Sequence, residues 1–337
     1  MPKPAKAPGV RAGPEIPLDL VPMEAEPVDA LPTGREWLYE PKHDGFRCLA
    51  FGDGGDVRLQ SRSGKPLARY FPEVAAGLAA LPAGRFVLDG ELVIPGEPFE
   101  TLQLRLHPAA SRIERLAREH PAALVAFDLL CDADGRSRLQ EPFESRRTAL
   151  KAFLAATGDS PVLRLSPATR SAATARRWLG RAGLDGIVAK RLDLPYRPGE
   201  RAMAKYKLWH TIDCVVGGLY RKRGTGRVDS LLLGLYDAEG RLHYVGRARV
   251  DKHAGLGAEL GAELEPLIGG PGFTGRAPGG VSRWSQKERK PVPLRPVKVA
   301  EVSADHITGA YMRHGARLLR FRDDKAPEAC TMDQLPG

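Results

Sequence analysis

The sequence predicts an α+β domain built on antiparallel sheets, followed by a small β-barrel of the OB-fold type. Three observations support this. The chain has 337 residues, which exceeds the usual size of one domain. Up to about residue 210, short apolar runs alternate with helical patterns, but without the regular repeat of a parallel α/β sheet. From residue 211 onward, closely spaced strands with one helical stretch are typical of a small barrel.

The first domain should contain a β-hairpin within residues 46–61. Apolar side chains alternate along FRCLAF and VRLQS, and GDGG between them is typical of a turn. Further apolar runs predict strands, and periodic segments predict helices. The strands are expected at 85–94, 122–130 and 184–190, and the helices at 72–81, 145–156 and 174–183.

The second domain is expected to begin near residues 210–213. DCVVGGLY, SLLLGLY, LHYVGRARV and VKVAEVSADHI predict strands, and residues 253–267 predict a helix. The N-terminus is rich in Pro, Ala and Gly, which is typical of disorder. The predicted organisation is a disordered tail at 1–16, a first domain at 17–210, the barrel at 211–330 and a C-terminal tail at 331–337.

Composition and charge narrow the function classes. The net charge of +10, from 51 Lys and Arg against 41 Asp and Glu, fits a polyanionic partner or a merely basic enzyme. No apolar run of about 18 residues is present, which excludes a spanning helix, and the N-terminus does not resemble a secretory signal. The four cysteines are far apart in sequence, so reduced thiols in the cytosol are expected rather than zinc ligands or disulfides.

The segment EPKHDGFR places Lys42 beside an acid–glycine pair. A lysine has a pKa near 10.4, so a nucleophilic lysine needs burial or nearby cations that disfavour its ammonium form. In AKYKLWH, Lys205 and Lys207 lie on one face of a predicted strand, where they could depress the pKa of that amine and bind phosphate oxygens. The alternative is a solvated edge strand marked by alternating lysines.

Acidic residues interrupt several apolar runs. LDGEL contains Asp89 and Glu91, AFDLL contains Asp128, and LDGIVAK begins with Asp185 and ends at Lys190. A carboxylate in an apolar run is costly unless it is paired or metal-bound, so these acids suit Mg²⁺ or Mn²⁺ held jointly with substrate phosphates. The alternative is that each Asp-Gly pair is simply a turn.

Phosphate binding must rely on side chains, because the sequence contains neither a P-loop nor a dinucleotide-binding fingerprint. The cluster RFRDDK at 320–325 could bind a polyphosphate, although such a cluster is more often a solvated tail.

Taken in order, KHDGFR, SRSG, LDGE, AFDLL, LDGIVAK, KYK and RDDK resemble the motifs of the covalent nucleotidyltransferase superfamily of DNA ligases, RNA ligases and capping enzymes. The resemblance extends from about residue 37 to 330. Within the superfamily, LHPAASR and RHGARLLRFRDDK are most similar to the small bacterial ATP-dependent DNA ligases of the C type. The resemblance implies that the first domain is a nucleotidyltransferase (adenylation) domain and that the second domain is an OB-fold.

The resemblance also implies a reaction. Lys42 would attack the α-phosphorus of ATP and retain AMP; AMP would pass to the 5′-phosphate of a nick, and the 3′-hydroxyl would displace it. The implied contacts with the base are Glu40 with the adenine amino group and Phe127 with the purine ring. Arg47 and Glu91 would contact the ribose, and Arg62 would contact the ribose or the DNA 5′-phosphate. Lys205 and Lys207 would bind the α-phosphate, and Lys190 completes the set of nucleotide-binding residues. Glu91 and Asp185 would hold the metal, and Arg322, Asp324 and Lys325 would orient pyrophosphate before leaving so that DNA can enter.

Some details remain open at the sequence level. Many relatives carry glutamate at the position of Asp185, a difference that could shift metal preference towards Mn²⁺. Segments characteristic of NAD-dependent ligases are missing, so ATP is the expected adenylate donor. The expected partners are nicked duplex DNA and DNA-repair proteins. The protein is expected to be a monomer and to lie at the nucleoid in a bacterial cytoplasm. The alternatives are an RNA ligase, a GTP-dependent capping enzyme or a non-catalytic DNA-binding protein.

Overall fold

The computed structural model describes residues 16–181, 183–207, 209–222, 224–250, 256–279, 290–305, 307–312 and 315–335. The chain divides into two compact units, Met1–Leu208 and Trp209–Gly337. Of the N-terminal tail expected at 1–16, only Ile16 is described, and it is buried in a core cluster rather than disordered. No helix in the described part of the chain is long and apolar enough to cross a membrane.

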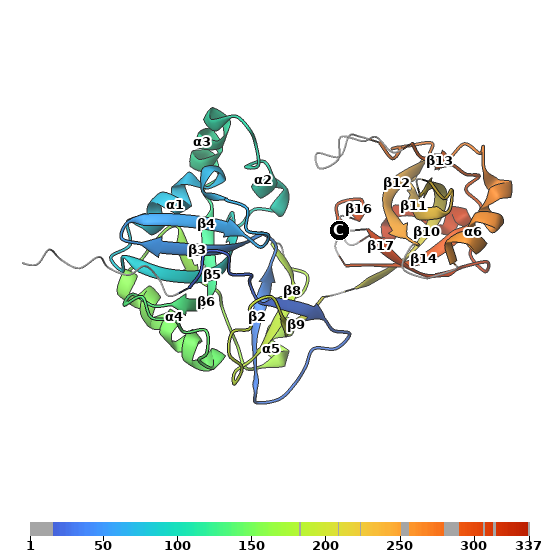
Figure 1. The fold of residues 1–337 in the computed structure, drawn as a ribbon. Coiled ribbons are helices and arrows are strands. Elements are labelled where there is room, and N and C mark those ends of the chain that lie inside the picture. The colour runs from blue at the N-terminus through green and yellow to red at the C-terminus, as the bar shows by residue number, and fades with distance from the viewer. Residues whose placement is uncertain are drawn as a thin grey trace, which may run out of the picture. The chain divides into compact units, whose positions relative to one another are not determined.

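Two sheets form the first unit (Figure 1). The five-stranded sheet has the order β4-β3-β5-β6-β7, and the four-stranded sheet has the order β1-β9-β8-β2. The strands of the larger sheet are β3 (Phe46–Asp53), β4 (Asp56–Ser61), β5 (Arg85–Val93), β6 (Ala123–Cys131) and β7 (Leu163–Leu165). Those of the smaller sheet are β1 (Glu24–Pro27), β2 (Trp37–His43), β8 (Leu184–Arg191) and β9 (Arg201–Tyr206).

The predicted hairpin is confirmed as β3 and β4, with Gly54 and Gly55 at positive φ in its turn. Buried strands β5 and β6 carry long apolar runs, and α4 packs against β6. The helical elements of this unit are η1 (Ala68–Tyr70), α1 (Pro72–Ala79), α2 (Phe99–Gln103), α3 (Ala110–Glu119), α4 (Phe143–Thr157) and α5 (Ala172–Arg176).

Two predictions about this fold are wrong in part. The helix predicted at 174–183 is limited to α5, which begins after the cap Ser171 and ends at Arg176. Further on, Gly180 and Gly183 adopt left-handed φ angles of 74° and 75°, so a helix cannot continue through them. The sheets are also not wholly antiparallel. Parallel pairing joins β1 to β9 and β6 to β7.

The second unit is built on one sheet of order β11-β12-β17-β14-β10-β13, in which β11 also pairs with β10. Its strands are β10 (His210–Arg221), β11 (Val228–Tyr236), β12 (Leu242–Arg249), β13 (Val292–Pro293), β14 (Val299–Ala304) and β17 (Ala316–Phe321), with a small pair β15 (Ile307–Thr308) and β16 (Tyr311–Met312). Its helical elements are α6 (Leu256–Leu264), η2 (Glu265–Leu267), η3 (Pro327–Ala329) and η4 (Met332–Gln334). Here β12 and β17 pair in parallel.

The segment expected to be a C-terminal tail is part of the second unit. Met332 and Leu335 pack against its core. The Gln334 side-chain amide donates to the Asp213 carbonyl at 3.1 Å and accepts from the Asp213 amide at 3.1 Å. These contacts anchor the end of the described chain beside the start of β10.

Candidate active site

Lys42 lies where the chain crosses between the two sheets of the first unit. Strand β2 of the smaller sheet ends at His43, and β3 of the larger sheet begins at Phe46. Between them, a Cβ at Gly45 would lie 2.1 Å from the Leu92 carbonyl oxygen, so no other residue fits this crossing without displacing the backbone. The acid–glycine pair therefore fixes the position of the lysine between the sheets.

Asp185 brings two lysines together. Its Oδ2 lies 2.7 Å from the Lys42 Nζ and 2.9 Å from the Lys207 Nζ. The Asp185 side chain is buried, and the Lys42 side chain is 26% exposed. Gly186 follows with φ 123°, and a Cβ there would lie 2.3 Å from the Tyr206 carbonyl oxygen, which explains the glycine after the acid. Lys42 and Asp185, which are 143 positions apart in the sequence, are thus in direct contact through the lysine amine.

Arg47 is held by a buried network. Its guanidinium binds both carboxylate oxygens of Asp89, at 2.5 and 2.6 Å, and Tyr196 Oη donates to the same carboxylate at 2.7 Å. Asp89 is fully buried. The expectation that Asp89 suits a divalent cation is therefore replaced by a structural role, because a bidentate arginine already satisfies its charge.

Glu91 lies two residues further along β5 and faces the cavity. The pKa of its carboxyl group is raised to about 7. Burial is the largest cause, the cations Lys42 and Arg47 oppose the rise, and the charges of Asp89 and Asp44 add to it. The carboxylate form of Glu91 is thus poorly compensated by the protein alone.

Glu40 forms a buried ion triad. One carboxylate oxygen accepts from Arg147 at 2.9 Å, and the other forms an ion pair with the Lys190 Nζ at 2.7 Å. Arg147 also donates to the Ser166 carbonyl oxygen. Burial lowers the pKa of Lys190, and Glu40 opposes that shift. Arg147 was not predicted, because a basic residue on an amphipathic helix gives no sign of a partner 107 positions earlier.

Phe127 is flanked by cations. The Arg47 guanidinium lies 4.6 Å from the centre of its ring, and the Lys190 Nζ lies 4.2 Å from that centre. Both distances are typical of cation–π interactions, so the Phe127 ring lies in a polar environment.

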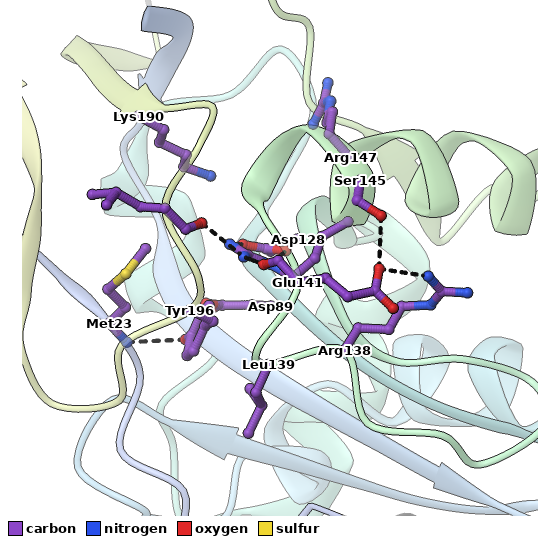
Figure 2. Close-up of polar contacts among 12 residues, drawn as sticks. Met23, Asp89, Asp128, Arg138, Leu139, Glu141, Ser145, Arg147, Lys190 and Tyr196 are labelled. Carbon is purple, nitrogen blue, oxygen red and sulfur yellow. Dashed lines mark hydrogen bonds and ion pairs between the residues drawn. The ribbon is translucent and has the colours of Figure 1, made fainter. Parts of the chain in front are cut away.

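Asp128 is buried within the network of polar contacts shown in Figure 2. Arg146 of α4 binds both of its carboxylate oxygens at 2.8 and 2.9 Å, and it also donates to the carbonyl oxygens of Glu141 and Leu194. Side chains alternate along a strand, so the residue next to Phe127 must face the other side of the sheet. The position of Asp128 in an apolar run had suggested a ligand for a divalent metal ion. In the structure its carboxylate is instead bound by Arg146.

A cavity of about 200 Å³ collects most of the predicted nucleotide contacts. Arg62 lines it with a side chain that is 71% exposed, and Lys205 lines it with a pKa that is lowered by burial and by the charges of Lys42 and Lys207. The lining residues are Glu24, Ala25, Glu40, Pro41, Lys42, His43, Arg47, Arg62, Glu91, Phe127, Val188, Lys190, Met203 and Lys205. Asp185 and Lys207 adjoin it through Lys42.

Sequence reasoning missed two polar members of this lining, Glu24 and His43. His43 contacts the Ser166 hydroxyl at 3.3 Å, and burial together with the charges of Lys42 and Lys190 lowers the pKa of its imidazole to about 4. It is therefore neutral near pH 7. The position of His43 directly after Lys42 was the sequence signal that could have identified it as a site residue. For Glu24 the sequence offered no such signal beyond its charge.

The predicted RDDK residues form an ion cluster within the second unit. Arg322 binds both carboxylate oxygens of Asp324 at 2.7 and 2.8 Å. Lys325 binds Asp213 Oδ2 at 2.9 Å, and an Arg322 nitrogen lies 3.3 Å from the same oxygen. Asp213 was not predicted, and it holds both cations of the cluster.

Within the ranges that the structure describes, no group of three or more His, Cys, Asp and Glu side chains is placed to hold a metal ion. The four cysteines, Cys48, Cys131, Cys214 and Cys330, are all buried.

Two family models cover the chain. The ATP dependent DNA ligase domain matches residues 22–207, and the ATP dependent DNA ligase C terminal region matches residues 224–325. The chain belongs to the ATP-dependent DNA ligases. Neither match supports an RNA ligase or a GTP-dependent capping enzyme.

This ligase is 46% identical to DNA ligase C2 of Mycolicibacterium smegmatis, over 93% of each chain. It is 41% identical to DNA ligase C of Mycobacterium tuberculosis, also over 93% of each. A solved structure of a Lig E DNA ligase matches 89% of the ligase and 98% of that chain, with a TM-score of 0.56 at 18% identity, which shows a shared fold. The predicted resemblance to ATP-dependent DNA ligases of the C type is confirmed.

Proposed function

We propose that this ligase seals 5′-phosphate/3′-hydroxyl nicks in duplex DNA through AMP bound covalently to Lys42. The observation that carries this proposal is the position of the Lys42 amine, which lines the cavity and contacts Asp185 at 2.7 Å. The amine would attack the α-phosphorus of ATP, forming an N–P bond as the P–O bond to pyrophosphate breaks. A 5′-phosphate oxygen of the nick would then displace the lysine, and the 3′-hydroxyl would displace AMP.

The attacking amine must first lose a proton. Asp185 is the carboxylate in contact with Lys42, and it also binds Lys207. Because two ammonium groups share one carboxylate oxygen, neither is fully neutralised by it. Lys205 lies close enough to Lys42 for that charge to contribute to lowering the Lys205 pKa, so it adds to the positive charge around the α-phosphate.

The cavity lining supports the proposed nucleotide contacts. Arg47, fixed by Asp89, would bind the ribose together with Glu91, and Phe127 would stack on the purine once one of its flanking cations moves aside. Both carboxylate oxygens of Glu40 are already bound by cations, so a contact with the adenine amino group would share one of them. Arg62 and Lys190 complete the proposed set.

We further propose that Glu91 and Asp185 hold Mg²⁺ or Mn²⁺ together with ATP phosphates. Carboxylate oxygens together with substrate phosphate oxygens are donors that suit a hard cation, and the raised pKa of Glu91 indicates a carboxylate that a cation would stabilise. When bound, the ion would neutralise negative charge on the phosphates. The side chain of Asp185 is shorter than a glutamate, which could favour Mn²⁺.

For the second unit we propose an OB-fold that binds DNA. The pairing of β11 with both β12 and β10, and of β14 with both β17 and β10, supports a five-stranded barrel. The net charge of +10 supports binding of nicked duplex DNA. We place the ligase at the bacterial nucleoid as a monomer that works with DNA-repair proteins.

Mass spectrometry of the intact protein after incubation with ATP and a divalent metal tests this function. We expect one added AMP, on a peptide that contains Lys42, and loss of that AMP when nicked duplex DNA is supplied. Nicked RNA and GTP serve as controls. AMP on another residue, or sealing of the nick without any adduct, would contradict the mechanism.

Replacing Lys325 by alanine is expected to reduce lysine adenylation by about 10²-fold, because it removes a cation proposed to orient the leaving pyrophosphate. Sealing of a nick that already carries AMP releases no pyrophosphate, so that step should change by less than about threefold. Rapid quenching of both reactions measures the difference. Lys151→Ala is the control, because this lysine is exposed on α4 of the first unit. An equal loss in both reactions would exclude the proposed role.

A further inference from the structure

Glu24 is a polar member of the cavity lining that the proposed mechanism leaves unused. Its backbone is fixed by the network that fixes Arg47. The Met23 amide donates to the Tyr196 hydroxyl at 2.9 Å, and Arg47 donates to the Met23 carbonyl oxygen at 3.1 Å. The Glu24 amide then donates to the Glu200 carbonyl oxygen at 2.8 Å. The start of β1 is therefore held in place beside the cavity.

The carboxylate of Glu24 lies at the cationic end of the cavity. It is 34% exposed, and an oxygen lies 3.8 Å from Nε of Arg62. Its charge also opposes the lowering of the Lys205 pKa. The ion pair with Arg62 is long and solvent-exposed, so it contributes little by itself. The Glu24 carboxylate lines the proposed nucleotide cavity and thus remains available to a ligand.

The chemistry of ATP restricts what this carboxylate can bind. An ionised carboxylate only accepts hydrogen bonds, and the phosphates of ATP repel it. ATP offers hydrogen-bond donors at the adenine amino group and at the two ribose hydroxyls. Glu40 and Phe127, the proposed purine-stacking residue, both contact Lys190. Glu40 is therefore the carboxylate near the purine. Glu24 instead neighbours Arg62, which leaves the ribose hydroxyls as its donors.

We propose that Glu24 accepts a hydrogen bond from a ribose hydroxyl of ATP, and that it thereby selects ribonucleotides over deoxynucleotides as adenylate donors. This inference rests on the proposed function, because the orientation of ATP follows from it. Glu24 is a specificity-determining residue in this scheme. Acidic side chains recognise ribose hydroxyls in the same way in dinucleotide-binding folds.

Equilibrium binding without divalent metal tests the inference separately from covalent chemistry. Calorimetry would compare ATP, 2′-deoxy-ATP and 3′-deoxy-ATP on the wild type, Glu24→Leu, Glu24→Gln and Glu26→Leu. Glu26 is the matched control, since it lies on the same strand but is exposed and does not line the cavity. We expect the wild type to prefer ATP over at least one deoxy analogue by about tenfold, the effect of one hydrogen bond to a charged group.

Glu24→Leu should bring that preference close to one by weakening ATP binding, while Glu26→Leu should keep it. Glu24→Gln retains an acceptor and should keep part of the preference; it also provides the measurement if Glu24→Leu fails to fold. An unchanged preference in both Glu24 variants, or equal weakening of ATP and both analogues, would overturn the inference. A wild type that shows the preference but never forms covalent AMP would refute the proposed function and leave the role of Glu24 standing.

Discussion

Replacing Lys42 by arginine is expected to abolish the covalent AMP adduct and ligation from ATP. Arginine keeps the positive charge, but its pKa is far above that of lysine, so its neutral form is on the order of 10³-fold rarer at pH 7. The contact with Asp185 can persist, because a guanidinium also binds a carboxylate. The loss would therefore report the missing nucleophile and not a collapsed site. Transfer of radiolabel from α-labelled ATP to the protein measures it.

Two controls make this result decisive. Lys151→Arg changes an exposed lysine of α4 and should leave labelling unchanged. Sealing of a nick that already carries AMP forms no bond to lysine, so Lys42→Arg should affect it much less than ligation from ATP. If the arginine variant still accumulated covalent AMP, another residue would be the nucleophile, and the mechanism would have to be rebuilt around it.

The sequence allowed prediction of the strands that carry long apolar runs. β5, β6 and β8 were found this way, because each is bounded by charged or turn residues. β1 was not, because EAEP is short, charged and ends in proline, and its pairing with β9 depends on residues 177 or 178 positions away. Glu24 was missed for the same reason. A side chain's place in a cavity follows from tertiary pairing, which short strands do not encode locally.

The acids show a second limit of sequence reasoning. A carboxylate within an apolar run indicates a buried charge that needs a partner, and this held for Asp89, Asp128 and Asp185. The sequence does not say whether that partner is a metal, a lysine or an arginine. Asp89 and Asp128 bind arginines, and only Asp185 of the three binds the proposed nucleophile. The need for a partner was therefore predictable, but its identity was not.

Removing the carboxylate of Asp128 should be the most destabilising of the substitutions considered. Asp128→Ala leaves the Arg146 guanidinium, which is fully buried, without its counter-ion. Breaking a buried ion pair on one side costs about 3–5 kcal/mol, because the remaining charge stays out of water. Urea unfolding of the variant, followed by tryptophan fluorescence, measures this loss. Arg170→Ala, which breaks the exposed pair with Glu144, should cost less than about 1 kcal/mol.

A double variant separates lost charge compensation from lost packing. Asp128→Leu combined with Arg146→Met removes both charges and keeps apolar volume, so it should be more stable than Asp128→Ala. Recovery should be incomplete, because Arg146 also donates to the carbonyl oxygens of Glu141 and Leu194, which would lose those bonds. The ion pair also joins the strand of Phe127 to the helix of Arg147, so Asp128→Ala should weaken ATP binding as well. If Asp128→Ala were as stable as the wild type, Arg146 would have to reach water or another acid, and the ion pair would not be what holds α4 beside the cavity.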